Sequence, residues 1–331
     1  MQAAGLPVFF CEHAFPVARL REQAGSCARL KHVFFIAGPT ASGKSEVAAE
    51  VAARAGAEIV SADAFQIYRG LPLLSAQPDE ASLRKAPHHL IGTVPLSEQM
   101  SAEKFRELAL SAIEEINRRG KLALVVGGSG LYLKALTHGL APLPAVDHQL
   151  RAELNALSLD ELNLRLLAVD PLGAEKIDRK NKRRLVRALE IFAQTNTPAS
   201  AQRARWQTQA VSAPGVFVFR ERADLYARID QRVEDMFRAG VVDEVAAARQ
   251  VSATAAQMLG FQPIRRLLAQ EISAPECVAA IQQATRRYAK RQLTWFRHQT
   301  TLEALNLTLL KDHHAAADSI LQKLSLLPPL E

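Results

Sequence analysis

Residues 33–52 have the sequence VFFIAGPTASGKSEVAAEVA, and this stretch decides the fold. It opens on an apolar run rich in β-formers, which is typical of a buried strand. Residues 38–45 match the pattern G-x-x-x-x-G-K-[ST], and apolar residues at helical spacing follow Lys44. A strand, a glycine-bounded loop and a helix in this order predict a phosphate-binding loop. The alternative is a chance match in an ordinary strand–turn–helix unit.

Each part of this loop is suited to holding phosphate oxygens. The glycines let the backbone turn its N–H groups inward, and the helix N-terminus adds partial positive charge. Lys44 is expected to reach terminal phosphate oxygens, and the Ser45 hydroxyl is expected to bind Mg²⁺. The pattern does not identify the ligand, because ATP, GTP and other diphosphates present similar oxygens. The residues predicted to bind the diphosphate are Gly38, Pro39, Thr40, Ala41, Ser42, Gly43, Lys44 and Ser45.

The composition is ordinary for a globular protein but has a basic bias. The 331 residues suffice for one large or two ordinary domains with a sizeable core. A net charge of +7 and a pI near 9.5 favour an anionic partner, nucleic acid first. The cysteines form no C-x-x-C pair and no metal-ligand spacing, which predicts a cytoplasmic location. No apolar run approaches the length of a membrane span, so no membrane partner is expected.

Residues 1–30 contain arginines, few acids and small apolar patches. They lack the basic start and the continuous apolar core of a signal peptide. We expect a short disordered extension, or a start codon assigned too early.

Alternating strand and helix patterns predict an α/β fold, in which helices flank a parallel sheet of the P-loop NTPase type. Residues 147–209 differ, because the pattern there is wholly helical. The simplest organisation is a core of residues 31–144 and 210–331 with an all-helical insertion at 145–209. Strands are expected at 33–37, 57–60, 121–128 and 215–219, and helices at 101–119, 223–249 and 275–298.

Two polar segments are expected near the phosphate loop, because ligand groups gather beyond the carboxyl ends of parallel strands. Asp63 follows the second strand and is a candidate base or Mg²⁺ partner, although it could simply cap a turn or helix. The sequence GGSG at 127–130 follows the third strand, where a tight turn is the alternative. His88 and His89 have no third metal ligand at a useful spacing, which favours packing or a polar contact.

Two helical stretches concentrate positive charge. They are EKIDRKNKRRLVRALEIF at 175–192 and TRRYAKRQLTWFRHQ at 285–299. Basic groups with interleaved aromatic residues suit contact with a nucleic-acid backbone together with base stacking. A solvated charged face over buried aromatic residues is the alternative.

Taken together, these motifs resemble the bacterial type of the tRNA dimethylallyltransferase family, also called tRNA isopentenyltransferases. The match runs in order from about residue 31 to residue 297 and is far more specific than the loop alone. It rests on GPTASGKS (38–45), DAFQIYRG (63–70), PHHLIG (87–92), VVGGSGLYLKAL (125–136), RRLVRALEIF (183–192), RADLYARIDQRVEDMFRAGVVDEV (222–245), QMLGFQ (257–262) and TRRYAKRQLTWFR (285–297).

The resemblance implies that the loop holds the diphosphate of dimethylallyl diphosphate. N6 of adenosine 37, in tRNAs that read UNN codons, then attacks C1 of the allyl group, and diphosphate leaves. The implied catalytic residues are Asp63 as general base, and Lys44, Thr40 and Arg222, with Mg²⁺, as stabilisers of the leaving group. The adenine must leave its stack to react.

The resemblance also implies how tRNA is held. The helical insertion is expected to clamp the anticodon stem-loop, and the enzyme is expected to be a cytoplasmic monomer. The residues expected to contact tRNA are Asp63, Ala64, Phe65, Gln66, Ser129, Arg183, Arg184, Leu185, Val186 and Arg187.

The sequence departs from the family pattern along one loop. Ala64 replaces a serine, Gln77 replaces a lysine, and Gly92 replaces an acid. Three other functions are compatible with parts of the sequence: an adenylate isopentenyltransferase, a P-loop small-molecule kinase and a non-catalytic RNA-binding protein descended from the enzyme. The insertion and the two basic helices disfavour an enzyme that acts on a small nucleotide. The retained Lys44, Asp63 and Arg222 disfavour a protein without catalysis.

Overall fold

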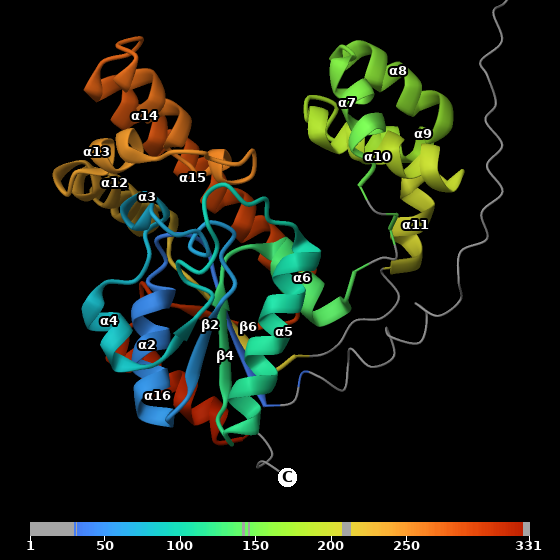
Figure 1. Cartoon of the computed structure of the whole chain (residues 1–331). Coiled ribbons are helices and arrows are strands. Elements are labelled where there is room, and N and C mark those ends of the chain that lie inside the picture. Colours follow the sequence, from blue (N-terminus) through green and yellow to red (C-terminus); the bar gives the residue numbers. More distant parts are fainter. Residues whose placement is uncertain (1–29, 31, 141–142, 145, 207–212, 327–331) are drawn as a thin grey trace, which may run out of the picture.

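The computed structural model describes residues 30, 32–140, 143–144, 146–206 and 213–326. The extension predicted for residues 1–30 lies outside the described residues, apart from Leu30. Figure 1 shows a layered α/β core, with the helical insertion as a separate lobe beside it. None of the described helices is both long and apolar enough to cross a lipid bilayer.

The core is built on a six-stranded sheet in the order β3-β2-β4-β1-β5-β6, and every neighbouring pair is parallel. β1 lies between β4 and β5, with Val33 opposite Ala123 and Phe35 opposite Gly215. The predicted parallel sheet is therefore confirmed. The strands are β1 (Val33–Ala37), β2 (Glu58–Ser61), β3 (His88–His89), β4 (Ala123–Gly127), β5 (Gly215–Phe219) and β6 (Glu303–Asn306).

Alternate residues of the strands face opposite layers of helices. Phe34 and Ile36 of β1 face α2 and α16, whereas Val33 and Phe35 face the layer that contains α5, α6 and α15. Figure 1 shows α2 and α16 on one side of the sheet and α5 on the other. Full burial of such side chains contributes about 1.5–3 kcal/mol each. The covering helices are α2 (Lys44–Ala55), α5 (Ala102–Arg118), α6 (Gly130–His138), α15 (Ala274–Gln299) and α16 (His313–Leu324).

The helical insertion has a hydrophobic core of its own, which includes the fully buried Leu162 and Leu185. Its helices begin at defined caps: Ser158 forms a capping box with Glu161, and the Asp147 carboxylate accepts backbone N–H groups. All the described secondary structure between Asp147 and Trp206 is helical. The helices are α7 (His148–Ala156), α8 (Leu159–Val169), α9 (Pro171–Lys176), α10 (Lys182–Thr195) and α11 (Ala199–Trp206).

Two expectations about the remaining elements need correction. The helix expected at 223–249 is broken, because Gly240 has a φ of 92°, a left-handed value that interrupts a helix. Strands β3 and β6 were not predicted, since one has only two residues and the other, EALN, has no apolar run. The other described helices are α3 (Pro72–Ser75), α4 (Glu80–Lys85), α12 (Arg222–Arg238), α13 (Val241–Ala247), η2 (Ala255–Gln257) and α14 (Phe261–Leu268).

Candidate active site

The phosphate loop connects the central strand β1 to helix α2, as the sequence pattern predicts. Gly43 has a φ of 92°, which favours glycine, and Ala41 has a φ of 61°. Gly38 is required for a different reason, because a Cβ there would lie 2.4 Å from the Val218 carbonyl oxygen of the neighbouring strand. The conformation of the loop therefore depends on its glycines.

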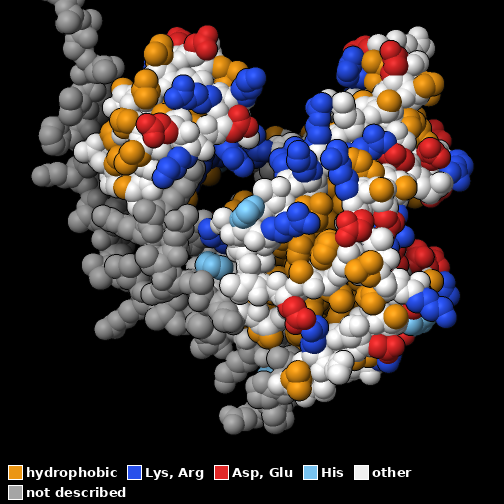
Figure 2. All heavy atoms as spheres, turned by 180° about the vertical axis from the view of Figure 1, so that it is seen from behind, with side chains coloured by type: hydrophobic (Ala, Val, Ile, Leu, Met, Phe, Trp, Pro, Cys, Tyr) orange, Lys and Arg blue, Asp and Glu red, His pale blue; other side chains and the backbone are white. Residues whose placement is uncertain are grey.

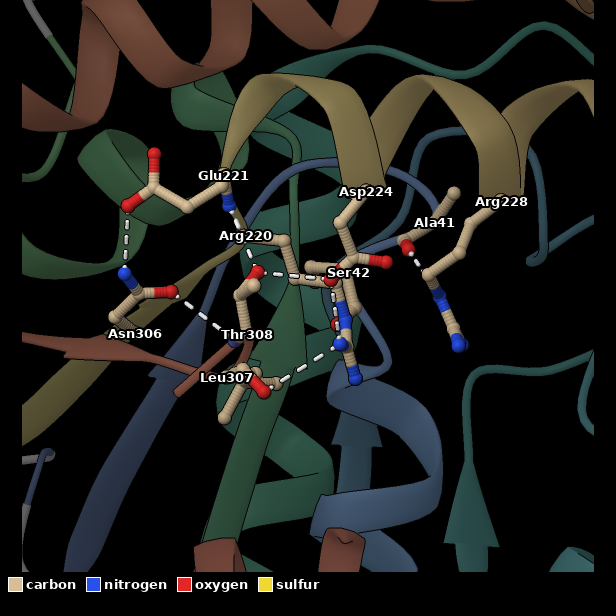
Figure 3. A network of polar contacts seen from close by, with 9 residues as sticks. All are labelled: Ala41, Ser42, Arg220, Glu221, Asp224, Arg228, Asn306, Leu307 and Thr308. Carbon is tan, nitrogen blue, oxygen red and sulfur yellow. Dashed lines mark hydrogen bonds and ion pairs between the residues drawn. The ribbon is translucent and has the colours of Figure 1, made fainter. Parts of the chain in front are cut away.

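Two arginines hold the backbone of this loop from outside, as Figure 3 shows. Arg220 Nε donates to the Ser42 carbonyl oxygen at 2.8 Å, and Arg228 Nε donates to the Ala41 carbonyl oxygen at 3.1 Å. Arg220 is itself fixed by an ion pair with Asp224 at 2.9 Å. These bonds fix the Ala41 and Ser42 carbonyl groups on the outer side of the loop.

A third arginine reaches the inner part of the loop. Arg232 Nη1 donates to the Thr40 hydroxyl at 3.1 Å, and Lys44 Nζ donates to the Pro39 carbonyl oxygen at 3.3 Å. Burial lowers the pKa of Lys44, the Asp63 carboxylate opposes this effect, and Arg232 adds to it. Burial likewise lowers the pKa of Arg232, again opposed by Asp63. Two cations that lie this close in a buried site favour an anionic ligand.

Asp63 lies at the carboxyl end of β2 and faces the phosphate loop. Its Oδ1 accepts backbone N–H groups from Phe65 at 2.9 Å and Gln66 at 3.3 Å, so the carboxylate also caps a turn, the alternative interpretation of this residue. The adjacent Ala64 N–H donates to the Ser129 hydroxyl at 3.0 Å. The structure therefore brings Asp63, the GGSG segment and the phosphate loop together at one edge of the sheet.

A pocket lies between the phosphate loop and this edge. Lys44, Ser45 and Asp63 form its polar end. The other lining residues are a mixture of apolar side chains and the polar side chains of Ser61, Gln66 and His88. Such a lining offers contacts to both an anionic group and a small apolar group of a ligand. The apolar lining residues are Ala48, Ile59, Pro78, Ile91 and Val126.

The departures from the family pattern have structural roles. Gln77 Nε2 donates to the carbonyl oxygens of Gln66 at 2.9 Å and of Tyr68 at 2.8 Å. Gly92 has a φ of 59°, a left-handed value. The side chain of Gln66 is also engaged, since it accepts from Ser61 and donates to the Ala76 carbonyl oxygen. This loop is therefore held by hydrogen bonds of its own.

The two adjacent histidines make polar contacts, as the sequence favours. His88 Nδ1 lies 2.8 Å from the Ala86 carbonyl oxygen, and His89 Nε2 lies 2.8 Å from the carboxylate of Glu58. Arg119 and Lys121 also contact Glu58, whose side chain is only 4% exposed. Burial raises the pKa of Glu58, but hydrogen bonds from His89, Arg119 and Lys121 outweigh it and lower the pKa to about 2.

Arg222 lies elsewhere. Its side chain is exposed at the start of α12, with its guanidinium 5.2 Å from the centre of the Tyr226 ring. The guanidinium that lies beside Thr40, Lys44 and Asp63 belongs to Arg232, which the sequence analysis did not single out. The role expected for Arg222 stays a prediction, and the structure adds Arg232 as a second arginine near the loop.

The segment expected to contact tRNA divides into two sets. Arg183 and Arg184 are exposed on α10, whereas Leu185 is fully buried and Val186 is 3% exposed in the core of the insertion. Arg187 is half-buried and bonded to the Glu190 carboxylate and the Pro144 carbonyl oxygen, at 2.8 Å and 3.0 Å. The prediction that the side chains of Leu185 and Val186 contact RNA is wrong, because they pack inside the insertion.

The residues around the loop fit a magnesium ion that arrives with a diphosphate. Mg²⁺ prefers hard oxygen ligands and usually keeps few protein ligands in phosphate sites. The Ser45 hydroxyl and the Asp63 carboxylate line the same pocket and offer such oxygens. The Ser42 hydroxyl is buried and has no hydrogen-bond partner among the described residues. An oxygen of a ligand, an ion or a water molecule can satisfy a polar group of this kind.

The fold and this site define a phosphate-loop enzyme with a carboxylate beside the loop. More specifically, the chain belongs to the IPP transferase family, whose sequence profile matches residues 66–299. A tRNA dimethylallyltransferase from Akkermansia muciniphila is 41% identical over 290 residues, which cover 88% of this chain and 98% of the relative. A tRNA dimethylallyltransferase 1 from Citrifermentans bemidjiense is 43% identical over 270 residues, 80% of this chain and 88% of the relative.

A solved structure has the same architecture. The full-length tRNA isopentenylpyrophosphate transferase from Bacillus halodurans is 32% identical and superposes with a TM-score of 0.64. The match covers 89% of this chain and 97% of that protein. The family resemblance drawn from the sequence motifs is therefore confirmed.

Proposed function

We propose that this protein transfers the dimethylallyl group of dimethylallyl diphosphate to N6 of adenosine 37 in tRNA. The observation that carries the proposal is that Lys44 and Asp63 line one pocket together with apolar side chains, while Arg232 lies beside them on the Thr40 hydroxyl. The names of the similar proteins support both the donor and the acceptor. The cations suit a diphosphate, and the apolar lining residues suit a five-carbon group.

The donor is activated by stabilising its leaving group. Negative charge develops on the bridging oxygen as the bond from C1 to diphosphate breaks. Three groups are available to stabilise that charge: Lys44, the first backbone N–H groups of α2, and Arg232, which is bonded to Thr40. Mg²⁺, when bound with Ser45, neutralises further charge on the phosphates.

Asp63 is suited to act as the general base. The exocyclic amine of adenine is a poor nucleophile, because its lone pair is delocalised into the ring. As the N6–C1 bond forms, a proton must leave N6, and the Asp63 carboxylate accepts it. One carboxylate oxygen is held by two backbone N–H groups, which orients the carboxylate while the other oxygen takes the proton. Such proton transfer contributes about 10²–10⁴-fold to a rate.

The acceptor is proposed to bind across the face shared by the core and the insertion. Figure 2 shows an open groove between two lobes, with lysine and arginine side chains gathered at its base. Arg183 and Arg184 are exposed on the insertion, and Arg287, Lys290 and Arg291 belong to α15 of the core. A positively charged groove of this kind attracts a phosphate backbone. The insertion would then hold the anticodon stem-loop while adenosine 37 leaves its stack.

The proposal includes a cytoplasmic monomer that uses Mg²⁺, and one assay separates it from its alternatives. Purified protein is mixed with radiolabelled dimethylallyl diphosphate and Mg²⁺. Parallel acceptors are an unmodified tRNA that reads a UNN codon, the same tRNA with guanosine at position 37, and AMP. We expect label in the first tRNA alone. Label in AMP would identify an adenylate isopentenyltransferase, and no label in any acceptor would contradict a transferase.

A further inference from the structure

One buried side chain connects the two loops of the site. Gln292 lies on α15, close to the C-terminal end of that helix, and is 6% exposed. Its Oε1 accepts the backbone N–H of Thr40 at 2.9 Å, and its Nε2 donates to the Gly128 carbonyl oxygen at 2.8 Å. A single amide therefore joins the phosphate loop to the GGSG segment.

The close approach of α15 explains two glycines of the GGSG segment. A Cβ on Gly128 would lie 2.5 Å from Gln292 Nε2 and 2.7 Å from the Gly38 carbonyl oxygen. A Cβ on Gly130 would lie 2.5 Å from the Trp295 ring. Neither glycine is among the positive-φ residues of the described chain. These glycines leave room for the α15 side chains, and the turn itself does not require them.

The bridge extends to the two groups that carry the proposed chemistry. On one side, the Thr40 hydroxyl of the phosphate loop accepts from Arg232 at 3.1 Å. On the other side, Gly128 precedes Ser129, whose hydroxyl accepts the N–H of Ala64, the neighbour of Asp63. Tyr288, one turn earlier on α15, lies near both Ser129 and Gln292. The positions of the leaving-group site and the base are therefore linked through Gln292.

We propose that Gln292 is a positioning residue, which fixes the phosphate loop relative to the Asp63 segment so that donor and base are held at reacting distance. This inference rests on the proposed function. Glutamine suits the position because it presents an acceptor and a donor at once. Glutamate has no donor for Gly128, asparagine is one methylene shorter, and methionine has similar length but no N–H. Small displacements of reacting groups carry large rate penalties.

The test compares Gln292→Met and Gln292→Glu with Gln283→Met, a control at an exposed position of the same helix. Folding is verified by circular dichroism, and assays are run well below each melting temperature. We expect kcat for transfer to fall by about tenfold or more in both Gln292 variants. The Kd for tRNA should stay within about twofold, because Gln292 is buried. Gln283→Met should retain wild-type values.

Three results would overturn the inference. The first is a folded Gln292→Met enzyme whose kcat stays within about twofold of wild type. The second is a tRNA affinity that falls by the same factor as kcat, which would indicate an RNA contact. The third is full activity in Gln292→Glu, which would show that the bond to Gly128, and hence the bridge, is not needed.

A second measurement keeps this inference separate from the proposed function. Binding of inorganic diphosphate with Mg²⁺ is measured by calorimetry in the wild type and in Gln292→Met. We expect a severalfold weaker affinity in the variant, because the loop that binds the anion is no longer held. Equal affinities would overturn the positioning role. Absence of prenyl transfer in the wild type would instead contradict the proposed function alone.

Discussion

Replacement of Arg232 by glutamine is the most informative perturbation of the site. The guanidinium is half-buried, donates to the Thr40 hydroxyl at 3.1 Å, and lies in the same charge cluster as Lys44 and Asp63. Glutamine keeps an N–H donor on a shorter side chain and removes the positive charge. The change therefore tests whether this charge stabilises the leaving diphosphate.

The expected magnitude follows from the position of the charge. A unit charge about 4 Å from another, at an effective dielectric constant of about 20, contributes about 4 kcal/mol. Loss of one preorganised group that stabilises a developing oxyanion lowers kcat by about 10²–10³-fold. We therefore expect Arg232→Gln to lower kcat/KM for dimethylallyl diphosphate by about 10²–10³-fold.

The matched control is Arg222→Gln, at the start of the same helix. That guanidinium is exposed and lies over the Tyr226 ring, an interaction of about 0.5–1 kcal/mol at exposed sites. Its replacement should change kcat/KM by less than about threefold. Both variants are assayed with saturating tRNA and varied donor. A larger loss in Arg222→Gln than in Arg232→Gln would refute the assignment of roles made from the structure.

Three further predictions concern the base, the acceptor and acid stability. Asp63→Asn should lower kcat by about 10²–10⁴-fold, measured by single-turnover assay, and leave the Kd for tRNA, measured by filter binding, within a few-fold. Loss of tRNA binding together with the loss of chemistry would argue against a general base. The double variant Arg183→Ala and Arg184→Ala should reduce the slope of log Kd for tRNA against log salt concentration by about 1.4–1.8, because two phosphate contacts are lost. An unchanged slope would show that these arginines face solvent and do not contact tRNA. The pKa of Glu58 is about 2, below the ordinary 4.5, so its pairing stabilises the fold above pH 4.5 and is lost as pH falls toward 2. In urea unfolding, Glu58→Gln should therefore cost about 2 kcal/mol more at pH 7 than at pH 3, and an equal cost at both pH values would be inconsistent with that shift.

The local parts of the fold were accessible from the sequence. The pattern at residues 33–52 predicts β1, the phosphate loop and α2, because their residues are contiguous and their apolar periodicities differ. The position of Asp63 beside the loop also follows, since parallel strands end at one edge of the sheet. The family motifs extend these predictions to the reaction class.

Which arginine contacts the phosphate loop depends on how α12 packs against it. The family motif singles out Arg222, but only the packed helix shows that its side chain is exposed. Arg228 and Arg232, one turn apart, bond to the Ala41 carbonyl oxygen and the Thr40 hydroxyl. Spacing from apolar residues does not separate them from Arg222, which lies three residues before the buried Leu225.

Other features are invisible in the sequence because they join distant segments. Gln292 contacts Thr40 across 252 positions, and no local pattern marks it among the residues of a basic helix. The arginines of the insertion present a related difficulty, because Arg187 pairs with the buried Glu190 carboxylate while the neighbouring Arg184 remains exposed. Only the tertiary structure separates arginines that hold the fold from those available to a partner.

The central claim is tested most directly by the product nucleoside. An unmodified tRNA that reads a UNN codon is incubated with the protein, Mg²⁺ and dimethylallyl diphosphate, then digested and analysed by mass spectrometry. We expect N6-(dimethylallyl)adenosine at position 37, with one diphosphate released for each nucleoside formed. Unmodified tRNA under conditions in which the protein binds both substrates would contradict the account.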